Sequence, residues 1–547
     1  MKISFLVVLT VIGGVYARSP HASGNTYEHY HSYIRERGLQ SKANAPAEEE
    51  NAAFWQNVAK STLTERLEQA TNKNTAKNVI LFLGDGMSIA TLTAARIHLG
   101  QRNGKTGEET FFSFEKFPFS ALSKTYCVDR QVADSACSST AYLSGVKANE
   151  ATLGVTAAVK LDDCNAMNNV TNHVYSIAHW AQLAGKRTGI VTTTRITHAS
   201  PGGTYAHTAN RDWEADVHVK ESNQDPENCL DIAQQLIHGE TGQKFNVILG
   251  GGRSNFLPNT IVDEDGVKGL RTDERNLIEE WNILKNQTKS QYISNLLGLQ
   301  SIELDTEYVL GLFNGNHLDF NLDRDVQKQP SLLEMVEKAL ELLSQSERGY
   351  FLFVEGGRID HAHHETRTRK ALDETIEFHK AIEAAVKKTN EEDTLIVVTA
   401  DHSHTMTVNG YPERGLDVLG IGGKGEDKLP YTTLSYANGE KGIVGSRPDI
   451  TNDDFCMSDK DYQYPSLAFV YSETHGGEDV AIFAKGPWAH LFTGVMEQNA
   501  IPYIMSYASC MGDFVDCLGR SSSGTVVNTL FVTMLSLTTL IIQKCWM

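Results

Sequence analysis

The chain is short of basic residues, and this shortage excludes one large class of partner. Its 547 residues include 49 Lys and Arg against 68 Asp and Glu, which gives a formal charge of −19. Because a phosphate backbone requires a basic footprint, the sequence argues against nucleic acid as a partner beyond terminal phosphates. A small anionic substrate is still allowed, since a local cationic site can dominate the potential of its own pocket.

The C-terminal end lacks an apolar run long enough to cross a membrane. Residues 526–542 are diluted by Asn, Ser and Thr and fall short of the ~20 apolar residues that a spanning helix needs. Small residues before a weak apolar tail favour a GPI-anchor signal over residues 521–547, with Ser521, Ser522 and Ser523 as candidate attachment residues. The polar spacer is shorter than the usual ~8–12 residues, so a weak membrane helix is the alternative.

The N-terminal end has the pattern of a secretory signal peptide. Lys2 precedes the apolar run 3–15, and the small residue Ala17 follows it, which predicts a signal peptide over residues 1–17; a buried terminal helix is the alternative. Residues 18–45 form a polar extension. Residues 54–70 space their apolar side chains at helical intervals and predict an amphipathic helix. The two ends together predict a GPI-anchored protein on the extracellular face of the cell membrane.

Cysteine is also scarce. Of eight cysteines, Cys545 lies in the predicted anchor signal, and the odd number that remains requires at least one that is free or pairs between chains. A secreted protein can form disulfides, and Cys510 and Cys517 are close enough in sequence to pair. The sequons at Asn169 and Asn286 are candidate glycosylation sites.

The central part of the chain has no internal repeat and alternates two kinds of segment. Continuous apolar runs such as "NVILFLG", "FNVILGG", "GYFLFV" and "DTLIVVT" alternate with helical stretches such as "SLLEMVEKALELLSQS". Strands that are apolar on both faces, alternating with helices, indicate a parallel sheet that is covered on both sides. We therefore predict an α/β fold with a large, mainly parallel central sheet.

Chemically active side chains follow these apolar runs at a common position. They are Asp85, His198, Glu355, Asp401 and His402. Open α/β sheets bind ligands in the crevice outside the carboxyl ends of their strands. Helix caps would explain an occasional Asp at such a place but not five placements together, so we expect these side chains to form one site.

The stretch "FVEGGRIDHAHHETR", residues 353–367, concentrates carboxylates and imidazoles next to an apolar run. A chain places such charge against its core only when something pairs with it, and the candidates are a metal, a buried ion-pair network and a solvated loop. Asp360 and His364 are four residues apart, so on a helix they share a face, and their chemistry suits zinc. His363 and Glu365 have no assigned role and are expected at the surface.

Ser135 is the candidate nucleophile, in the stretch "QVADSACSSTAYLSGVKAN". It precedes small residues that can begin a helix, and a helix N-terminus attracts phosphate. From this stretch alone, a helix cap supplied by Asp134 and Ser135 is the favoured interpretation. No neighbouring histidine supplies a general base in the manner of a G-x-S-x-G motif, although a metal can activate a serine by lowering its pKa.

Six motifs in one order resemble the alkaline phosphatases, specifically the membrane-anchored animal branch. They are "LGDGMS", "DSACSSTAYLSGVKAN", "HASPGGTYAHTANRDW", "VEGGRIDHAHHE", "TADHSH" and "ETHGGEDVAIFAKGP". The resemblance implies a three-layer α/β/α catalytic domain over residues 46–520, with a small crown insert at about 409–474 near the mouth of the site. It also implies that a homodimer hydrolyses phosphate monoesters through a phosphoserine.

The resemblance further implies two zinc ions and one magnesium ion per subunit. The first zinc would be held by Asp360, His364 and His475, and the second by Asp85, Asp401 and His402. The magnesium would share Asp85 and be held by Ser200 and Glu355. Ser135 would be the nucleophile, Arg211 would bind the phosphate, and His198 and His361 would support these groups from behind.

The resemblance also implies disulfide pairs, and at two positions this chain differs from the vertebrate members of the family. It pairs Cys164 with Cys229 and Cys510 with Cys517, and it leaves Cys127, Cys137 and Cys456 without an assigned partner. Where vertebrate members carry acidic calcium ligands, this chain has Asn314 and Gln329, so no calcium site is predicted.

Two other functions compete with a phosphomonoesterase. A catalytically inactive binding protein should have lost a ligand or the nucleophile, yet every assigned position carries a suitable residue. A related phosphodiesterase or sulfatase is the second alternative. Arg211 and a third metal site favour monoesters, because a dianionic phosphate gains more from extra positive charge.

Overall fold

The structure, a computed structural model, describes residues 44–263, 265–453 and 456–519. The predicted signal peptide, most of the polar extension and the predicted anchor signal lie outside the described residues, so these three assignments stay predictions. In the part of the chain that is described, no helix combines the length and the apolar character needed to cross a membrane.

The centre of the described chain is a ten-stranded sheet. In spatial order its strands are β17 (Gly494–Glu497), β2 (Phe119–Lys124), β16 (Val480–Lys485), β8 (Thr394–Thr399), β1 (Asn78–Gly84), β7 (Tyr350–Gly356), β3 (Arg187–Arg195), β4 (Val247–Gly251), β6 (Tyr308–Leu312) and β5 (Ser290–Ile293). Strand β16 is antiparallel to β2 and β8, and the other neighbours are parallel. The predicted α/β fold with a large, mainly parallel sheet is confirmed.

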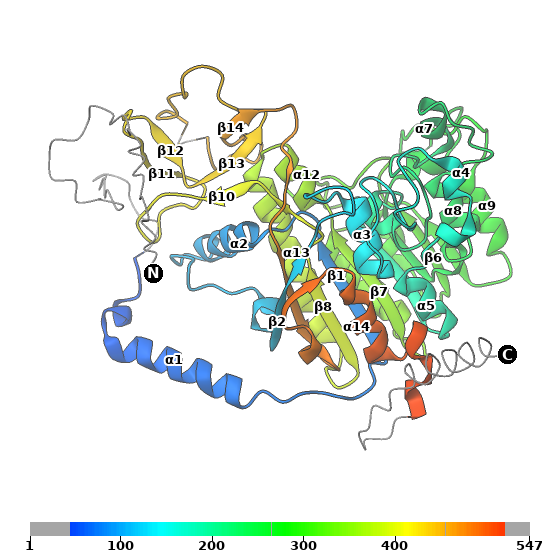
Figure 1. The fold of residues 1–547 in the computed structure, drawn as a ribbon, viewed down its shortest axis with the longest axis horizontal. Helices are drawn as coiled ribbons and strands as arrows, with labels where there is room; N and C mark the ends of the chain where they lie inside the picture. Colours follow the sequence, from blue (N-terminus) through cyan, green and yellow to red (C-terminus); the bar gives the residue numbers. More distant parts are fainter. Residues whose placement is uncertain (1–43, 264, 454–455, 520–547) are drawn as a thin grey trace, which may run out of the picture. The chain divides into compact units, whose positions relative to one another are not determined.

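Two apolar cores lie on opposite faces of this sheet, because side chains alternate along each strand. In β1, Ile80 and Phe82 join one core, whereas Leu81 and Leu83 join the other. Most of the buried helical residues of the first core come from α2 (Ile89–Arg102), α11 (Leu332–Leu343) and α13 (Thr368–Lys388). Most of those in the second core come from α3 (Ser135–Ser144), α5 (Ile177–Leu183), α8 (Ile232–His238), α9 (Leu277–Leu284) and α14 (Ala500–Ser509). Helices therefore cover both faces, and the layers are α/β/α (Figure 1).

Apart from α1, which has 16 residues, the remaining helices have 7 residues or fewer. The other helices are α1 (Ala52–Leu67), α4 (Cys164–Met167), α6 (Ala199–Gly202), α7 (Asp216–Glu221), α10 (Leu296–Ser301) and α12 (Arg358–His364). Single turns of 3-10 helix are η1 (Ala47–Glu50), η2 (Ser113–Lys116), η3 (Val170–Asn172), η4 (Gly242–Lys244), η5 (Arg253–Phe256) and η6 (Ala489–Leu491), and the longer η7 spans Gly512–Gly519.

The segment predicted as a crown insert contains small sheets of its own. One consists of β10 (Met406–Val408), β13 (Leu434–Gly439) and β14 (Ser466–Phe469), and another of β11 (Ile421–Lys424) and β12 (Pro430–Thr432). At the base of the insert, β9 (Ser403–His404) pairs with β15 (His475–Gly476). This pairing brings two residues that are far apart in sequence to the end of β8, where the candidate site lies.

The helix predicted over residues 54–70 exists, but it is not amphipathic. Helix α1 spans Ala52–Leu67, and none of its residues is buried. Its apolar residues are spread around the helix, and Trp55, Leu63 and Leu67 are more than half exposed. Spacing alone therefore predicted a helix correctly but not the face that it would bury.

Candidate active site

Four adjacent strands bring the predicted residues to one edge of the sheet. Strands β8, β1, β7 and β3 are neighbours, and all run in the same direction. Asp85 follows β1, Glu355 is the second-last residue of β7, Asp401 follows β8, and His198 follows β3. The register aligns Leu83 with Glu355, so the last residues of these strands end at the same level. The site predicted from the strand ends is thus assembled by the parallel sheet itself.

A first group of possible metal ligands consists of Asp85, Asp401 and His402, whose ligand atoms lie within 4.8 Å of one another. All three are fully buried. His402 Nε2 is 3.0 Å from Asp401 Oδ2 and 3.7 Å from Asp85 Oδ1. Burial, together with the charges of Asp401, Asp360 and Glu355, raises the pKa of Asp85 well above its usual value. Neither oxygen of Asp85 has a hydrogen-bond partner among the described residues, so a bound cation would compensate an otherwise costly buried charge.

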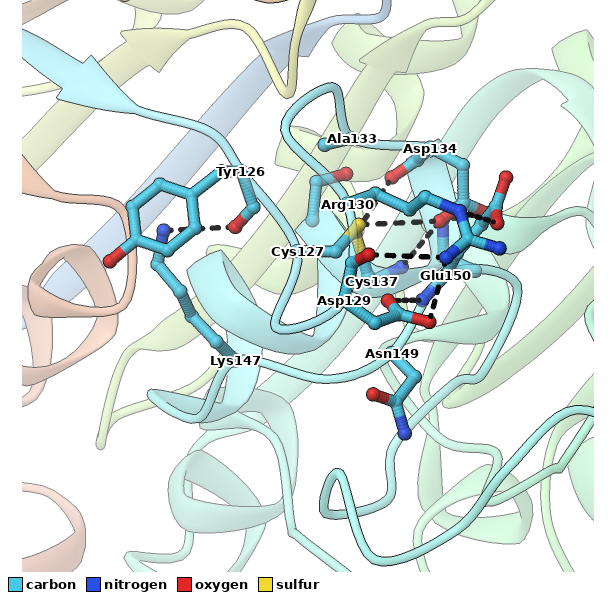
Figure 2. Close-up of a disulfide and its surroundings, with 12 residues drawn as sticks. Tyr126, Cys127, Asp129, Arg130, Ala133, Asp134, Cys137, Lys147, Asn149 and Glu150 are labelled. Carbon is cyan, nitrogen blue, oxygen red and sulfur yellow. Dashed lines mark hydrogen bonds and ion pairs between the residues drawn. A yellow bond between two sulfur atoms is a disulfide. The ribbon is translucent and has the colours of Figure 1, made fainter.

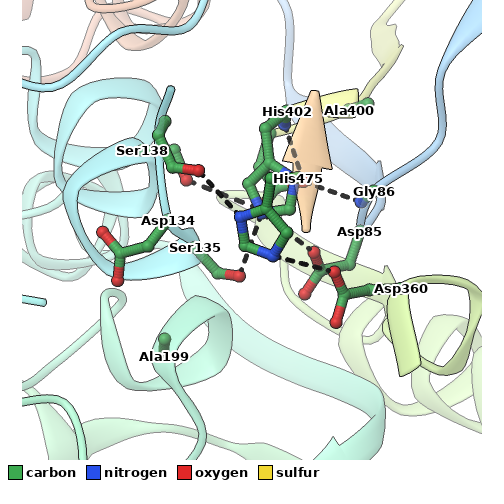
Figure 3. Close-up of polar contacts among 12 residues, drawn as sticks. Asp85, Gly86, Asp134, Ser135, Ser138, Ala199, Asp360, Ala400, His402 and His475 are labelled. Atoms are coloured by element: carbon green, nitrogen blue, oxygen red, sulfur yellow. Dashed lines mark hydrogen bonds and ion pairs between the residues drawn. The ribbon is translucent and has the colours of Figure 1, made fainter. Parts of the chain in front are cut away.

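A second group contains Asp360, His364 and His475, and Figure 3 shows Asp360 and His475. The first two lie on α12, one turn apart, and His475 enters from β15. His475 Nε2 lies 3.1 Å from His364 Nε2 and 3.3 Å from Asp360 Oδ1. The Nδ1 of His364 is 2.5 Å from the main-chain oxygen of Glu473, and that of His475 is 2.8 Å from the oxygen of Ala133. If each Nδ1 donates to its carbonyl, both Nε2 lone pairs face Asp360, as zinc ligation requires.

His404 belongs to the same group, and sequence reasoning missed it. Its Nε2 is 2.6 Å from Asp360 Oδ1, and its Nδ1 is 2.5 Å from Glu473 Oε2. Burial lowers the pKa of His404, but the carboxylates of Glu473 and Asp360 outweigh burial and raise this pKa to about 10. When protonated, His404 donates from both ring nitrogens to carboxylates and so orients Asp360. The second histidine of "TADHSH" was the available signal.

A third group surrounds Glu355. Asp85, His198 and Glu355 offer ligand atoms within 4.8 Å of one another. Thr194 Oγ1 donates to Glu355 Oε2 at 2.9 Å, whereas Glu355 Oε1 and the hydroxyl of Ser200 are buried without a hydrogen-bond partner among the described residues. Burial raises the pKa of Glu355 to about 7. The oxygens of Asp85, Glu355 and Ser200 suit a hard cation such as magnesium, since Nε2 of His198 instead lies 3.1 Å from Arg211 Nη2. Imidazoles with carboxylates in the other two groups suit zinc.

Ser135 lies beside these groups and begins helix α3. The helix cap is Asp134 and not Ser135, because the Asp134 carboxylate accepts from the main-chain N–H groups of Ala136 and Cys137. Ser135 is buried, and its Oγ is 3.3 Å from His402 Nε2 (Figure 3). The serine hydroxyl therefore faces the ligand groups, while the aspartate satisfies the helix end.

Arg211 approaches the same helix start from another loop. Its Nη1 is 2.9 Å from Asp134 Oδ2, and its Nη2 is 3.1 Å from His198 Nε2. The ring centroid of His361, the other predicted supporting residue, lies 5.4 Å from that of His198. The structure thus brings together Ser135, Arg211 and the supporting histidines that sequence analysis singled out.

His363 contradicts its predicted place at the surface. Its side chain is fully buried, with Nε2 3.0 Å from Thr91 Oγ1 and Nδ1 2.9 Å from the hydroxyl of Tyr436 in β13. The prediction was wrong because α12 packs on two sides, with the ligands on one face and these hydroxyl groups on another. Glu365, at the end of α12, is partly exposed and pairs with Arg367.

The cysteines that sequence analysis left unassigned are resolved in two different ways. Cys127 and Cys137 form a disulfide with each other, whereas Cys456 is exposed and unpaired among the described residues. Cys164 and Cys229 form a second disulfide.

Two further sequence predictions fall on residues that the structure describes only in part or does not test. Cys510 is disulfide-bonded, but the side chain of Cys517 is not described, so that pairing stays a prediction. Asn169 and Asn286, the candidate glycosylation sites, are exposed.

Three ligand groups around a serine, at the carboxyl edge of a parallel sheet, define a site for several metal ions. The family model for alkaline phosphatase matches residues 76–511. A membrane-bound alkaline phosphatase of Bombyx mori is 49% identical over 89% of this chain and 90% of that protein, and the human tissue-nonspecific isozyme is 44% identical over 88% and 93%. The structure of a variant TAB5 alkaline phosphatase with Mg bound in its M3 site has a TM-score of 0.57 and 21% identity over 81% of this chain and 100% of that chain.

The chain therefore belongs to the alkaline phosphatase family. It is an enzyme that hydrolyses phosphate monoesters in a metal-dependent reaction, as the resemblance in the sequence predicted.

Proposed function

We propose that the enzyme transfers the phosphoryl group of a monoester to Ser135 and then hydrolyses the phosphoserine. The observation that carries this proposal is the buried hydroxyl of Ser135, which lies 3.3 Å from His402 at the start of a helix and beside the ligand groups. The helix N-terminus provides a positive potential for the phosphoryl oxygens, while Asp134 accepts from the N–H groups of Ala136 and Cys137. Phosphoryl transfer needs mainly positioning and charge stabilisation, which this arrangement supplies.

The three groups would hold two zinc ions and one magnesium ion. Asp360, His364 and His475 would hold the first zinc, and Asp85, Asp401 and His402 the second. Asp85, Ser200 and Glu355 would hold the magnesium. These ions would lower the pKa of bound hydroxyl groups and stabilise charge on the attacking and leaving oxygens. The uncompensated oxygens of Asp85, Ser200 and Glu355 support this assignment.

The remaining residues would bind and orient the substrate. Arg211 would hold two phosphoryl oxygens through its forked guanidinium, with Asp134 fixing the plane of that group. His198 and His361 would support the arginine and the third cation. Because these contacts address the phosphoryl group and not the alcohol, we expect broad choice among phosphate monoesters.

We also propose that the enzyme is a glycosylated homodimer held on the outer cell surface by a GPI anchor. The relative from Bombyx mori is described as membrane-bound, and the exposure of Asn169 and Asn286 is compatible with glycosylation. The exposed apolar residues Trp55, Leu63 and Leu67 of α1 support a contact with a second copy.

A paired assay tests the proposed chemistry. A phosphate monoester and a phosphate diester are supplied to the purified full-length enzyme, with and without a chelator, and product is measured over time. We expect turnover of the monoester to exceed that of the diester and to be lost with chelator and recovered with zinc and magnesium. Faster turnover of the diester would contradict the proposal.

A further inference from the structure

The Cys127–Cys137 disulfide closes a small ring around the start of the nucleophile helix. Cys127 lies in the segment after β2, and Cys137 lies in the first turn of α3, ten residues later (Figure 2). The ring therefore includes both Asp134 and Ser135. Both cysteines are buried, in a small apolar cluster that also contains Ala148. No part of the proposed chemistry uses this disulfide.

One carboxylate links the ring to the arginine that would bind phosphate. Asp134 Oδ1 accepts hydrogen bonds from the main-chain N–H groups of Cys137 and Ala151, each at 3.1 Å. The other oxygen, Oδ2, pairs with Arg211 Nη1 at 2.9 Å. The position of the Arg211 guanidinium therefore depends on the position in which the ring holds the Asp134 carboxylate.

The carboxylate is charged when it makes this pair. Burial opposes ionisation, but the Arg211 guanidinium and main-chain N–H groups hold the pKa of Asp134 below its usual value. A charged pair at this distance transmits a displacement of one partner to the other, because separating the charges in a partly buried place is costly.

Two polar contacts of the ring at the surface are weaker restraints than the disulfide. Arg130 pairs with Glu150 at 2.7 Å, but about half of each side chain is exposed, and exposed ion pairs are screened by water and salt. The main-chain N–H of Glu150 also donates to Asp129 Oδ1 at 2.9 Å, again at the surface. The disulfide is covalent and buried, so salt does not weaken it.

We propose that the Cys127–Cys137 disulfide positions the Asp134–Arg211 pair for phosphate binding. This inference rests on the proposed role of Arg211 as the phosphate-binding residue. Without the disulfide the ring has more accessible conformations, so Asp134 occupies a wider range of positions and Arg211 follows it. Ser135 is affected less, because α3 is also held by the core packing of residues such as Tyr142.

The test compares the full-length holoenzyme with its Cys127→Ala/Cys137→Ala double variant. We expect the inhibition constant of inorganic phosphate and the KM of a monoester to rise about threefold to tenfold, with kcat changing much less, because lost ground-state binding raises KM at constant kcat. Zinc content is measured in each protein and binding is compared at equal zinc content, because the ring also includes Ala133, whose main-chain oxygen lies 2.8 Å from His475 Nδ1. A matched control is Leu340→Ala, which removes a buried side chain from α11 on the other face of the sheet; it should lower the Tm without changing the inhibition constant.

A double-mutant cycle separates positioning from general destabilisation. If the disulfide acts through the arginine, removing it in the Arg211→Ala background should leave the inhibition constant of phosphate unchanged. The inference would be overturned if removing the disulfide weakened phosphate binding as much in the Arg211→Ala background as in the wild type. It would also be overturned if the double-cysteine variant bound phosphate like the wild type. If Arg211→Ala itself binds phosphate like the wild type, the proposed role of Arg211 fails, and this inference fails with it.

A second measurement covers the case in which the double variant does not fold. The wild-type enzyme is partly reduced, its free thiols are alkylated, and the modified fraction at Cys127 and Cys137 is mapped by mass spectrometry. We expect phosphate binding to weaken in proportion to that fraction in samples that keep the Cys164–Cys229 disulfide. Unchanged binding in fully modified, folded protein would contradict the inference.

Discussion

His404 and Glu473 form a buried ion pair, with Nδ1 of the histidine 2.5 Å from Oε2 of the glutamate. The second ring nitrogen of His404 faces Asp360, and the main-chain oxygen of Glu473 faces His364. Glu473 therefore supports two of the predicted zinc ligands at once, one through its carboxylate and one through its backbone. Such partners of metal ligands tune affinity as well as orientation.

Glu473→Gln should weaken zinc binding. The amide can still accept a hydrogen bond from His404, but the negative charge is lost, so His404 is less firmly protonated and holds Asp360 less well. We expect zinc affinity to fall about 10-fold to 100-fold, measured by competition with a chromogenic chelator. The matched control is Glu426→Gln, at an exposed position of the crown insert. Equal zinc affinity in Glu473→Gln and wild type would contradict this role.

Glu355→Gln should remove the predicted magnesium ion and leave the two predicted zinc ions bound. Glu355 is found only in the group with Asp85 and His198, whereas the two predicted zinc groups contain Asp360 or Asp401 and do not include Glu355. We expect the folded variant to keep both zinc ions, to lose magnesium and to lose much of its activity, as measured by elemental analysis beside a monoester assay. A folded variant without either zinc would show that the division among the groups is wrong.

Ser135→Ala should abolish the covalent route without disturbing the metals. The substitution removes one oxygen and no predicted ligand, so fold and metal content should survive while turnover falls by several orders of magnitude. Arg211→Ala should instead weaken substrate binding and still permit a phosphoserine. Acid quenching with labelled substrate should place the label on Ser135 in the wild type and in Arg211→Ala. Label on another residue, or undiminished turnover in Ser135→Ala, would refute the mechanism.

Glu374 should make stability depend on pH. It is buried on α13, its Oε1 accepts from the main-chain N–H of Asn321 at 2.6 Å, and burial raises its pKa to about 7. Because this pKa lies above the usual value of about 4.3, the folded protein binds more protons than the unfolded protein between these pH values. The contribution of Glu374 to stability therefore falls as pH rises from about 4.3 to about 7.

Glu374→Gln keeps the acceptor and removes the charge. We expect its free energy of unfolding to match the wild type at low pH and to exceed it by up to about 3 kcal/mol above pH 7. Thermal unfolding of both proteins between pH 5 and pH 8 measures the difference, with the exposed Glu426→Gln as control. A difference that does not change with pH would contradict the predicted titration.

The predicted anchor has a direct test in cells. Treatment of intact cells with a phosphatidylinositol-specific phospholipase should release the activity into the medium, because only a lipid would hold the enzyme. Activity that stays with the membrane while a known GPI-anchored protein is released would favour the membrane-helix alternative.

Sequence reasoning predicted the sheet and the strand-end groups because both depend on local patterns. The apolar runs of β1 and β7 and the polar residues that follow them are visible in the sequence. Sequence reasoning failed for His363 and His404, because each has a partner tens of residues away in the predicted crown insert, Tyr436 for His363 and Glu473 for His404. It also left Cys127 and Cys137 open, because disulfide connectivity follows from the path of the chain and not from spacing.

The antiparallel pair β9–β15 has a consequence for how the enzyme can diversify. Because this pair brings His404 beside His475, the polypeptide between them leaves and re-enters the catalytic body at one point. The entropy lost in closing such a loop grows only with the logarithm of its length. Changes of length in the exposed loops between β9 and β15, away from buried residues such as Tyr436 and Glu473, therefore add little closure entropy, and these loops can vary while the predicted zinc ligands keep their places.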